Sequence, residues 1–120
     1  MQGERYITKP GQYALVYDKG DTWLCKLVVM KSVPNRLSIS RYGFTVSRRV
    51  GKAVVRNRVR RLLREILRLV ALKPGWDIVL IARPAAATTD YKTLRQSVLH
   101  LLSRAQLVVE DNEEVCFSCD

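Results

Sequence analysis

Histidine and cysteine, the residues that most often bind metal ions or form covalent intermediates, are scarce in this chain of 120 residues. The one histidine, His100, has no cysteine or acidic residue at ligand spacing, so we predict no catalytic or metal-binding role for it. Three cysteines are an odd number and too few for a disulfide scaffold. Because the chain also lacks a hydrophobic signal core and any apolar run of membrane-spanning length, we expect a protein of the reducing cytoplasm with no membrane partner.

Acidic residues are scarce over most of the chain. Residues 1–109 contain all 21 Lys and Arg residues, and their net charge is +15, whereas the whole chain carries +10. Their acids are scattered: Glu4, Asp18, Asp21, Glu65, Asp77 and Asp90. A protein that hydrolyses phosphodiesters by itself needs a general base or a carboxylate cluster for Mg²⁺, and no two of these acids lie three or four residues apart on a predicted helix. The charge instead favours a polyanionic partner, without choosing among RNA, DNA and an acidic membrane.

The end of the chain differs in composition from the rest. Residues 110–120 hold five acids and no base, and we predict that they form a disordered tail on a single domain of residues 1–109. Cys116 and Cys119 have the spacing of half a zinc knuckle, but a zinc site also needs a second pair or a histidine. We therefore interpret both as free thiols, and Cys25 as a small buried hydrophobic residue.

Residues 41–69 change their periodicity at Gly51. Before it, Tyr42, Phe44 and Val46 alternate with small or polar residues, which predicts a half-buried strand. After it, apolar residues recur at helical spacing and predict one buried face: Val55, Val59, Leu62, Leu63, Ile66, Leu69 and Val70. At about 100° per residue, the opposite face carries Asn57, Arg60, Arg61, Arg64 and Arg68, with Arg56 and Arg58 at its two sides.

The charges of this predicted helix point to a nucleic-acid backbone. Between Arg48 and Arg68 there are nine basic residues and a single acid, Glu65. A helix that is only solvated usually mixes both signs and gains Glu–Lys pairs four residues apart. All basic residues from 54 to 69 are arginine, whose planar guanidinium group binds phosphate through two hydrogen bonds and stacks on bases. We therefore prefer phosphate binding to the alternative of a solvated surface helix.

The same stretch resembles the signature of the protein subunit of bacterial ribonuclease P, in which a strand ends in Ser and two basic residues before Val-Gly and a long Arg-rich string. The matching positions are Ser47, Arg48, Arg49, Val50, Gly51, Ala53, Val54, Arg56, Asn57, Arg58, Arg60, Arg61, Arg64 and Glu65. The resemblance covers about residues 5–108. It implies a ribonucleoprotein endoribonuclease that removes the 5′ leader from precursor tRNA and leaves a 5′-phosphate on the mature tRNA. It also implies that the RNA subunit supplies the chemistry with Mg²⁺, and that the protein alone binds no cofactor and is monomeric.

The resemblance assigns roles to individual residues. Those expected to contact the catalytic RNA or the adjacent substrate backbone are Arg48, Arg49, Lys52, Arg56, Asn57, Arg58, Arg60, Arg61, Arg64 and Arg68. Tyr13 and Tyr17 match aromatic residues that line a cleft for the single-stranded leader, although their spacing fits packing against the core equally well. Met30 is the nearest match to a further aromatic residue of that cleft.

The rest of the pattern predicts a two-layer α+β fold with a mixed sheet, in the order helix, two or three strands, helix, strand, helix. We expect a first helix from residues 8–10 to Gly20, a strand over residues 23–31, a turn at Pro34-Asn35 and a second strand from about Ser38, paired with the first as an antiparallel hairpin. Residues 76–82 form a strand covered on both faces and parallel to the one before the basic helix. A last helix follows a cap at Thr89 or Asp90. Right-handed crossovers are usual, but the resemblance implies a left-handed one in a ribosomal-protein-like domain.

Two other functions fit the composition. One is a structural RNA-binding protein of ribosomal type with no processing role. The other is a DNA-binding module in which Asn57 reads a base in the major groove, although no helix-turn-helix pattern surrounds it. The extended Arg-Asn-Arg string favours ribonuclease P over both.

Overall fold

A computed structural model describes residue 7 and residues 10–108 of the chain. Its elements are α1 (Pro10–Lys19), β1 (Asp21–Leu24), β2 (Val28–Pro34), β3 (Arg41–Thr45), α2 (Ala53–Arg68), β4 (Trp76–Ala82), the 3-10 helix η2 (Pro84–Thr88) and α3 (Tyr91–Arg104). The α+β class and the order of elements are as predicted. The predicted tail and its two cysteines lie outside the described residues. Within the described part, no helix is both long enough and apolar enough to cross a membrane.

The four strands form one mixed sheet in the order β1-β2-β4-β3. β4 pairs antiparallel with β2 and parallel with β3. The predicted hairpin between the strand of residues 23–31 and the strand from about Ser38 is therefore wrong, because β4 lies between β2 and β3. β4 takes the central place because it is apolar on both faces, whereas a strand at the edge leaves one side unpaired. The loop between β2 and β3 therefore crosses the end of β4, where the Asn35 N–H donates to the Gly75 carbonyl (2.8 Å) and the Gly75 N–H to the Ile39 carbonyl (3.3 Å).

The predicted strand over residues 23–31 is two strands. The chain reverses at the exposed Lys26, and the Cys25 N–H donates to the Val28 carbonyl (3.0 Å). β1 then runs back along β2, with Asp21 opposite Ser32. The apolar run predicts a single strand because Lys26 is its only turn signal.

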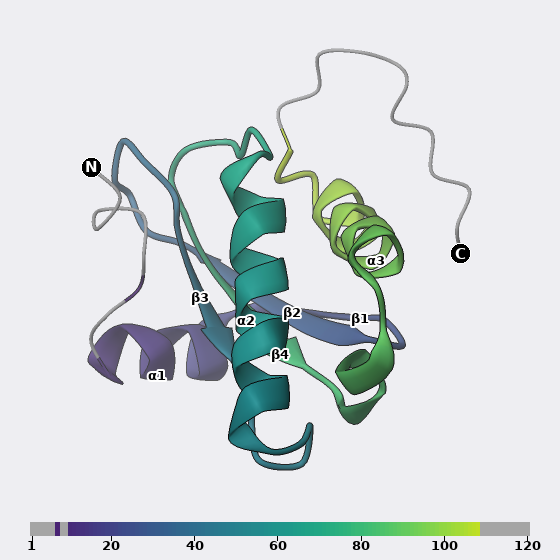
Figure 1. Ribbon diagram of the computed structural model, residues 1–120. Helices are drawn as coiled ribbons and strands as arrows, with labels where there is room; N and C mark the ends of the chain where they lie inside the picture. Colours follow the sequence, from purple (N-terminus) through teal and green to yellow (C-terminus); the bar gives the residue numbers. More distant parts are fainter. Residues whose placement is uncertain (1–6, 8–9, 109–120) are drawn as a thin grey trace.

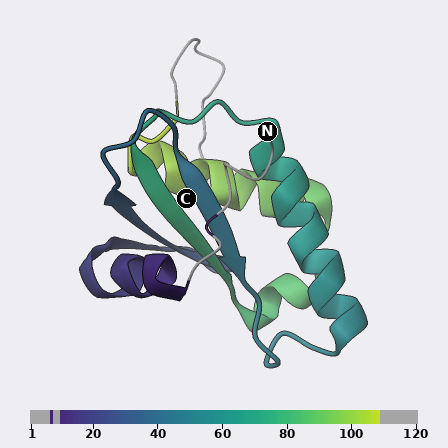
Figure 2. The same cartoon turned by 90° about the vertical axis from the view of Figure 1, so that its left-hand side faces the viewer.

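The sheet separates two layers of helices. α2 and α3 cover one face and α1 covers the other (Figures 1 and 2). Successive residues of β4 serve the two sides: Ile78 and Leu80 join the large core under α2 and α3, while Val79 packs with Val16 of α1 and with Ile7. The prediction that this strand is buried on both faces is confirmed.

The crossover from β3 through α2 to β4 has the rare hand. In Figure 1, α2 lies in front of β3 and β4, both strands run downward, and β4 lies to the right of β3. A parallel crossover with this arrangement is left-handed, as the resemblance implied.

The buried face of α2 is slightly rotated from the predicted one. Its fully buried residues are Val59, Leu63, Ile66 and Leu67. Leu62 is only partly buried, and Leu69, which caps the helix, is 62% exposed. Leu67, which the prediction omitted, is buried because it lies next to Leu63 on the edge of the helix that is turned toward the core. Leu62 and Leu69 lie on the other edge, which is turned away from the core.

Candidate RNA interface

The segment between β3 and α2 is a tight turn fixed to the core by the buried Val50. The Val50 N–H donates to the Ser47 carbonyl (3.1 Å), and the Gly51 N–H donates to the Arg48 carbonyl (3.2 Å). Gly51 has φ 153°, and a Cβ atom there would lie 3.1 Å from the Cβ of Val55. Both the backbone angle and the close contact require glycine at the point where strand becomes helix.

Three exposed cations precede α2: Arg48, Arg49 and Lys52. The first turn of the helix contains no acid, and Lys52 at the N-cap makes no side-chain cap hydrogen bond. The free N–H groups and the positive end of the helix dipole therefore lie at the same end of α2 as the three cations. This combination is suited to binding a phosphate group.

The outer face of α2 continues this positive surface. Arg61 and Arg64 are exposed and have no hydrogen-bonding or ionic partner among the described residues. Arg60 is partly exposed and donates to the Asn57 side-chain oxygen (3.0 Å), which holds the guanidinium group along the helix. The predicted position of these four residues on the solvent side of α2 is confirmed.

Glu65 and Arg68 form the one ion pair of α2 in the described part of the chain. Two hydrogen bonds join them, the shorter between Arg68 Nη2 and Glu65 Oε2 (2.7 Å). The hydrogen bond from Arg68 holds the pKa of the Glu65 carboxyl below its ordinary value. Both side chains are about half exposed, so water screens the pair and Arg68 remains accessible to a phosphate.

Two arginines at the sides of α2 bind the protein's own backbone. Arg58 donates to the carbonyls of Thr89 (2.7 Å) and Ala87 (3.5 Å), and so ties α2 to the segment that leads into α3. Arg56 donates through Nε to the Gly51 carbonyl (3.2 Å) and stiffens the start of the helix. Arg58 thus has a structural role in addition to the RNA contact predicted for it.

α1 lies on the face of the sheet opposite α2 (Figure 2), and its residues Tyr13 and Tyr17 contact β3. The Tyr17 hydroxyl shares a hydrogen bond with the Thr45 hydroxyl (2.8 Å), and Tyr17 is 41% exposed. The Tyr13 ring covers Gly43, where any side chain would collide with it. Burial, followed by the charge of Tyr17, raises the pKa of the Tyr13 hydroxyl above its ordinary value.

The tyrosines adjoin the positive surface through the chain itself. Thr45, which Tyr17 contacts, is the last residue of β3, and the exposed Arg48 and Arg49 follow within four residues. An aromatic surface on one side of the sheet and a cationic helix on the other therefore meet at the end of β3.

Comparison with known proteins identifies the family of this chain. The family model Ribonuclease P matches residues 1–106. The chain belongs to the ribonuclease P protein family. It is 45% identical, over the full length of both chains, to the ribonuclease P protein component of Dehalococcoides mccartyi strain CBDB1. It is 47% identical over 105 residues to that of Roseiflexus castenholzii, covering 85% of this chain and 86% of the relative.

Solved ribonuclease P proteins share the fold. A Staphylococcus aureus RNase P protein mutant with defective mRNA degradation activity superimposes with a TM-score of 0.84 at 28% identity, covering 89% of this chain and 92% of that one. The Thermotoga maritima RNase P protein gives 0.75 at 30% identity, covering 88% and 98%. These likenesses favour a ribonuclease P component with a role in tRNA processing over the ribosomal and DNA-binding alternatives.

Met30 is not part of the tyrosine surface. It has no exposed area, and it lies opposite Leu80 in the core under α2 and α3. Met30 was predicted only as the nearest match to an aromatic residue of the family, and its burial contradicts that prediction. Successive residues of β2 face opposite sides of the sheet, so those on the tyrosine side are Val29, Lys31 and Val33.

An ion pair that sequence patterns did not predict fixes β3 to β4 within this ribonuclease P protein. Arg41 donates to both carboxylate oxygens of Asp77, at 2.9 and 2.7 Å, and Asn35 donates to the same carboxylate (2.8 Å). Asp77 is 2% exposed. The guanidinium group of Arg41 is therefore engaged in this internal pair.

Asp90 also has a structural partner. The Asp90 side chain accepts from the Thr93 N–H (2.9 Å) and caps α3, as predicted. Among the described residues, no three His, Cys, Asp or Glu side chains are grouped closely enough to hold a metal ion.

Proposed function

We propose that this protein binds the catalytic RNA of ribonuclease P with the cationic face of α2 and holds the 5′ leader of precursor tRNA against Tyr13 and Tyr17. The residues assigned to RNA are those of the junction and the helix: Arg48, Arg49, Lys52, Arg56, Asn57, Arg58, Arg60, Arg61, Arg64 and Arg68. The complex removes the leader by hydrolysis and leaves a 5′-phosphate on the tRNA.

This proposal rests on one observation: the tyrosine surface of α1 and the cations before α2 adjoin at the end of β3. Base stacking on the tyrosines suits a flexible single strand, because every base has a face that can stack. The exposed arginines suit a backbone of phosphates and carry no sequence information. A substrate whose leader lies on the tyrosines is then positioned against an RNA bound by α2.

The protein's own groups support positioning and not bond cleavage. The buried carboxylate of Asp77 is neutralised by Arg41. The exposed carboxylate of Asp90 caps α3. We therefore assign the activation of water and the Mg²⁺ ions to the RNA subunit, which supplies this chemistry when assembled. The protein neutralises phosphates and brings the leader to that site.

Purification of the protein from its own cells, followed by sequencing of the bound nucleic acid, tests this function. We expect one RNA of a few hundred nucleotides, whose complex with the protein cleaves precursor tRNA to a 5′-phosphorylated product. Recovery of ribosomal subunits, or of DNA, would contradict the proposal. A matched preparation of the Arg61→Ala/Arg64→Ala variant should recover less of the same RNA.

A further inference from the structure

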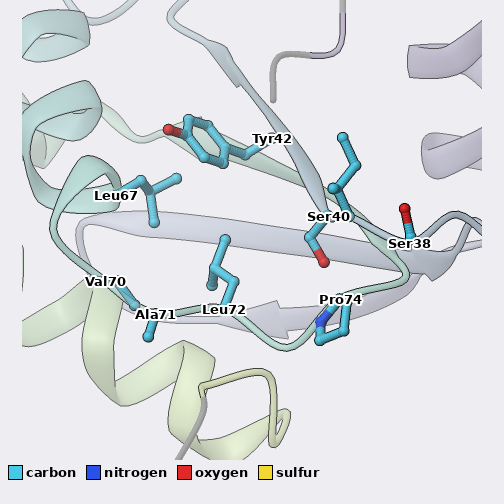
Figure 3. Close-up of a pocket in the computed structure, with 9 residues that line it drawn as sticks. Ser38, Ser40, Tyr42, Leu67, Val70, Ala71, Leu72 and Pro74 are labelled. Atoms are coloured by element: carbon cyan, nitrogen blue, oxygen red, sulfur yellow. The ribbon is translucent and has the colours of Figure 1, made fainter. Parts of the chain in front are cut away.

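A surface pocket of about 260 Å³ lies where the C-terminal end of α2 meets the loop before β4 (Figure 3). The buried Tyr42 and Leu67 form its floor. Its other walls come from two loops and are lined by Ser38, Ile39, Ser40, Val70, Ala71, Leu72 and Pro74. The Ser40 hydroxyl is engaged within the protein, with the Lys73 carbonyl and the Trp76 N–H. Most of the other side chains that line the pocket are apolar, whereas about half of its exposed lining consists of polar atoms.

Two basic residues are neighbours, in the chain, of residues that line this pocket. Arg68 directly follows the floor residue Leu67, and the exposed Lys73 lies between the wall residues Leu72 and Pro74. Arg64 lies one helical turn before Arg68 and Arg61 lies two turns before it, and neither has an ionic partner among the described residues. Glu65, the one acid of the helix, is already paired with Arg68. An occupant with an apolar side chain and several carboxylates fits this combination.

The chain supplies such a segment at this place. Val108 forms a β-bridge with Leu72, and the Lys73 N–H donates to the Leu107 carbonyl (2.8 Å), so the last described residues pass along the pocket wall. The residues that follow contain five acids, no base and one aromatic residue, Phe117. They lie beyond residue 106, where the match to the family model ends.

The length of this segment is sufficient. Residues 109–117 extend to about 26 Å and residues 109–120 to about 36 Å, whereas the whole of α2 is about 24 Å long. The segment can therefore reach Arg64 and return to the pocket. Because it is tethered beside its target, its effective concentration is in the millimolar range.

We propose that residues 110–120 bind the C-terminal half of α2, with their carboxylates on Arg61, Arg64 and Arg68 and the Phe117 side chain in the pocket. The segment thereby competes with RNA for the cationic face. Weak, non-specific RNAs lose this competition, whereas the large catalytic RNA displaces the segment. The competition rests on the proposed function, but the docking does not.

Docking is measured on the full-length protein without RNA. A nitroxide label on Cys119, in a variant with Cys25→Ser and Cys116→Ser, should broaden the amide signals of residues 64–73 and of Tyr42. The amides of the turn at Lys26, beyond α3, serve as an internal control and should not change. A second labelled variant, with the five acids replaced by Asn or Gln, should lose the effect. If the label broadens residues 64–73 no more than the control turn, or if the neutral tail gives the same pattern, the docking is wrong.

Competition is measured with a generic 20-nucleotide single-stranded RNA and with the catalytic RNA. With millimolar effective concentration and an intrinsic Kd of about 0.1–0.5 mM, deletion of residues 110–120 should tighten binding of the short RNA about three- to tenfold at 50 mM salt. The gain should shrink at 300 mM salt, because screening weakens the docked segment. Phe117→Ser should give part of the gain, and a scrambled tail of equal charge that moves Phe117 should behave like Phe117→Ser.

The two measurements separate the two proposals. A docked label together with unchanged short-RNA affinity after deletion would overturn the competition. A docked label in a protein that binds the catalytic RNA no better than the short RNA would count against the proposed function and leave the docking intact. A tail deletion that weakens RNA binding would overturn the inference, since the segment would then belong to the RNA site.

Discussion

The hydroxyl groups of Tyr17 and Thr45 lie 2.8 Å apart and join α1 to the last residue of β3. This bond fixes the exposed tyrosine ring beside the strand end from which the cationic junction begins. It also separates two properties of Tyr17 that mutation can test one at a time, the hydroxyl that holds α1 in place and the ring that stacks.

The Tyr13→Ala/Tyr17→Ala variant should bind precursor tRNA more weakly within the holoenzyme and mature tRNA unchanged. Each stacked base contributes about 1–3 kcal/mol, and only the precursor carries a leader. Affinities for long-leader precursor, one-nucleotide-leader precursor and mature tRNA measure this. The Tyr17→Phe variant is the control, since it keeps the ring and loses only the hydrogen bond to Thr45. Equal losses on all three RNAs, with a lowered Tm, would show that the tyrosines act as core residues.

The Arg61→Ala/Arg64→Ala variant should weaken assembly with the catalytic RNA and leave the fold intact, because both side chains are exposed and unpaired among the described residues. The dependence of log K on log salt should become shallower by about one for each phosphate contact that is lost. The exposed pair Lys92 and Arg95 on α3 provides a control of equal charge. If its double alanine variant weakened assembly as much, net charge and not the α2 face would govern binding.

Arg58→Ala should lower the free energy of unfolding, in contrast to Arg61→Ala. The Arg58 guanidinium group donates to two backbone carbonyls that lead into α3, and hydrogen bonds to charged groups contribute about 1.5–3 kcal/mol. Urea unfolding of the two single variants measures the difference, with Arg61→Ala expected within about 0.5 kcal/mol of wild type. Equal stability of the two variants would mean that the Arg58 contacts contribute nothing to the fold.

The Asp90 cap predicts a component of acid sensitivity. The hydrogen bond from Thr93 lowers the pKa of Asp90 below its ordinary value of 3.8. A lowered native pKa stabilises the fold above the unfolded value, and this stabilisation is lost as the pH falls through the native value. Asp90→Asn still caps the helix but does not titrate there. The Tm difference between wild type and Asp90→Asn should therefore shift against wild type as the pH is lowered from 6 to 3, and a constant difference would contradict this.

Features that are local in sequence were predictable. The helical spacing and one-sided charge of residues 53–68 gave the position of α2 and the side on which Arg61 and Arg64 lie. The polar residue before Tyr91 gave the cap of α3.

Features that depend on pairing between distant segments were not. Periodicity shows that a strand has one or two buried faces, but it does not name the neighbour, so the insertion of β4 between β2 and β3 was missed. The Arg41–Asp77 pair joins residues 36 positions apart, and no spacing rule connects them. The side of the sheet on which Met30 lies is set by the pairing of β2 with β4, and a resemblance at a single position does not specify that register.

The central place of β4 has a consequence for the order in which the protein is made. The ribosome releases β3 and the cationic helix before the strand that must lie between β3 and β2. Within the described sheet, β3 pairs only with β4, so it has no partner strand until residues 76–82 have been made. The pairing of β3 with β4 joins segments that are far apart in the sequence, and such contacts form slowly. The newborn chain therefore exposes the arginines of α2 ahead of its completed sheet. If RNA binds these arginines as proposed, it favours the native arrangement of α2 and so stabilises the folded chain.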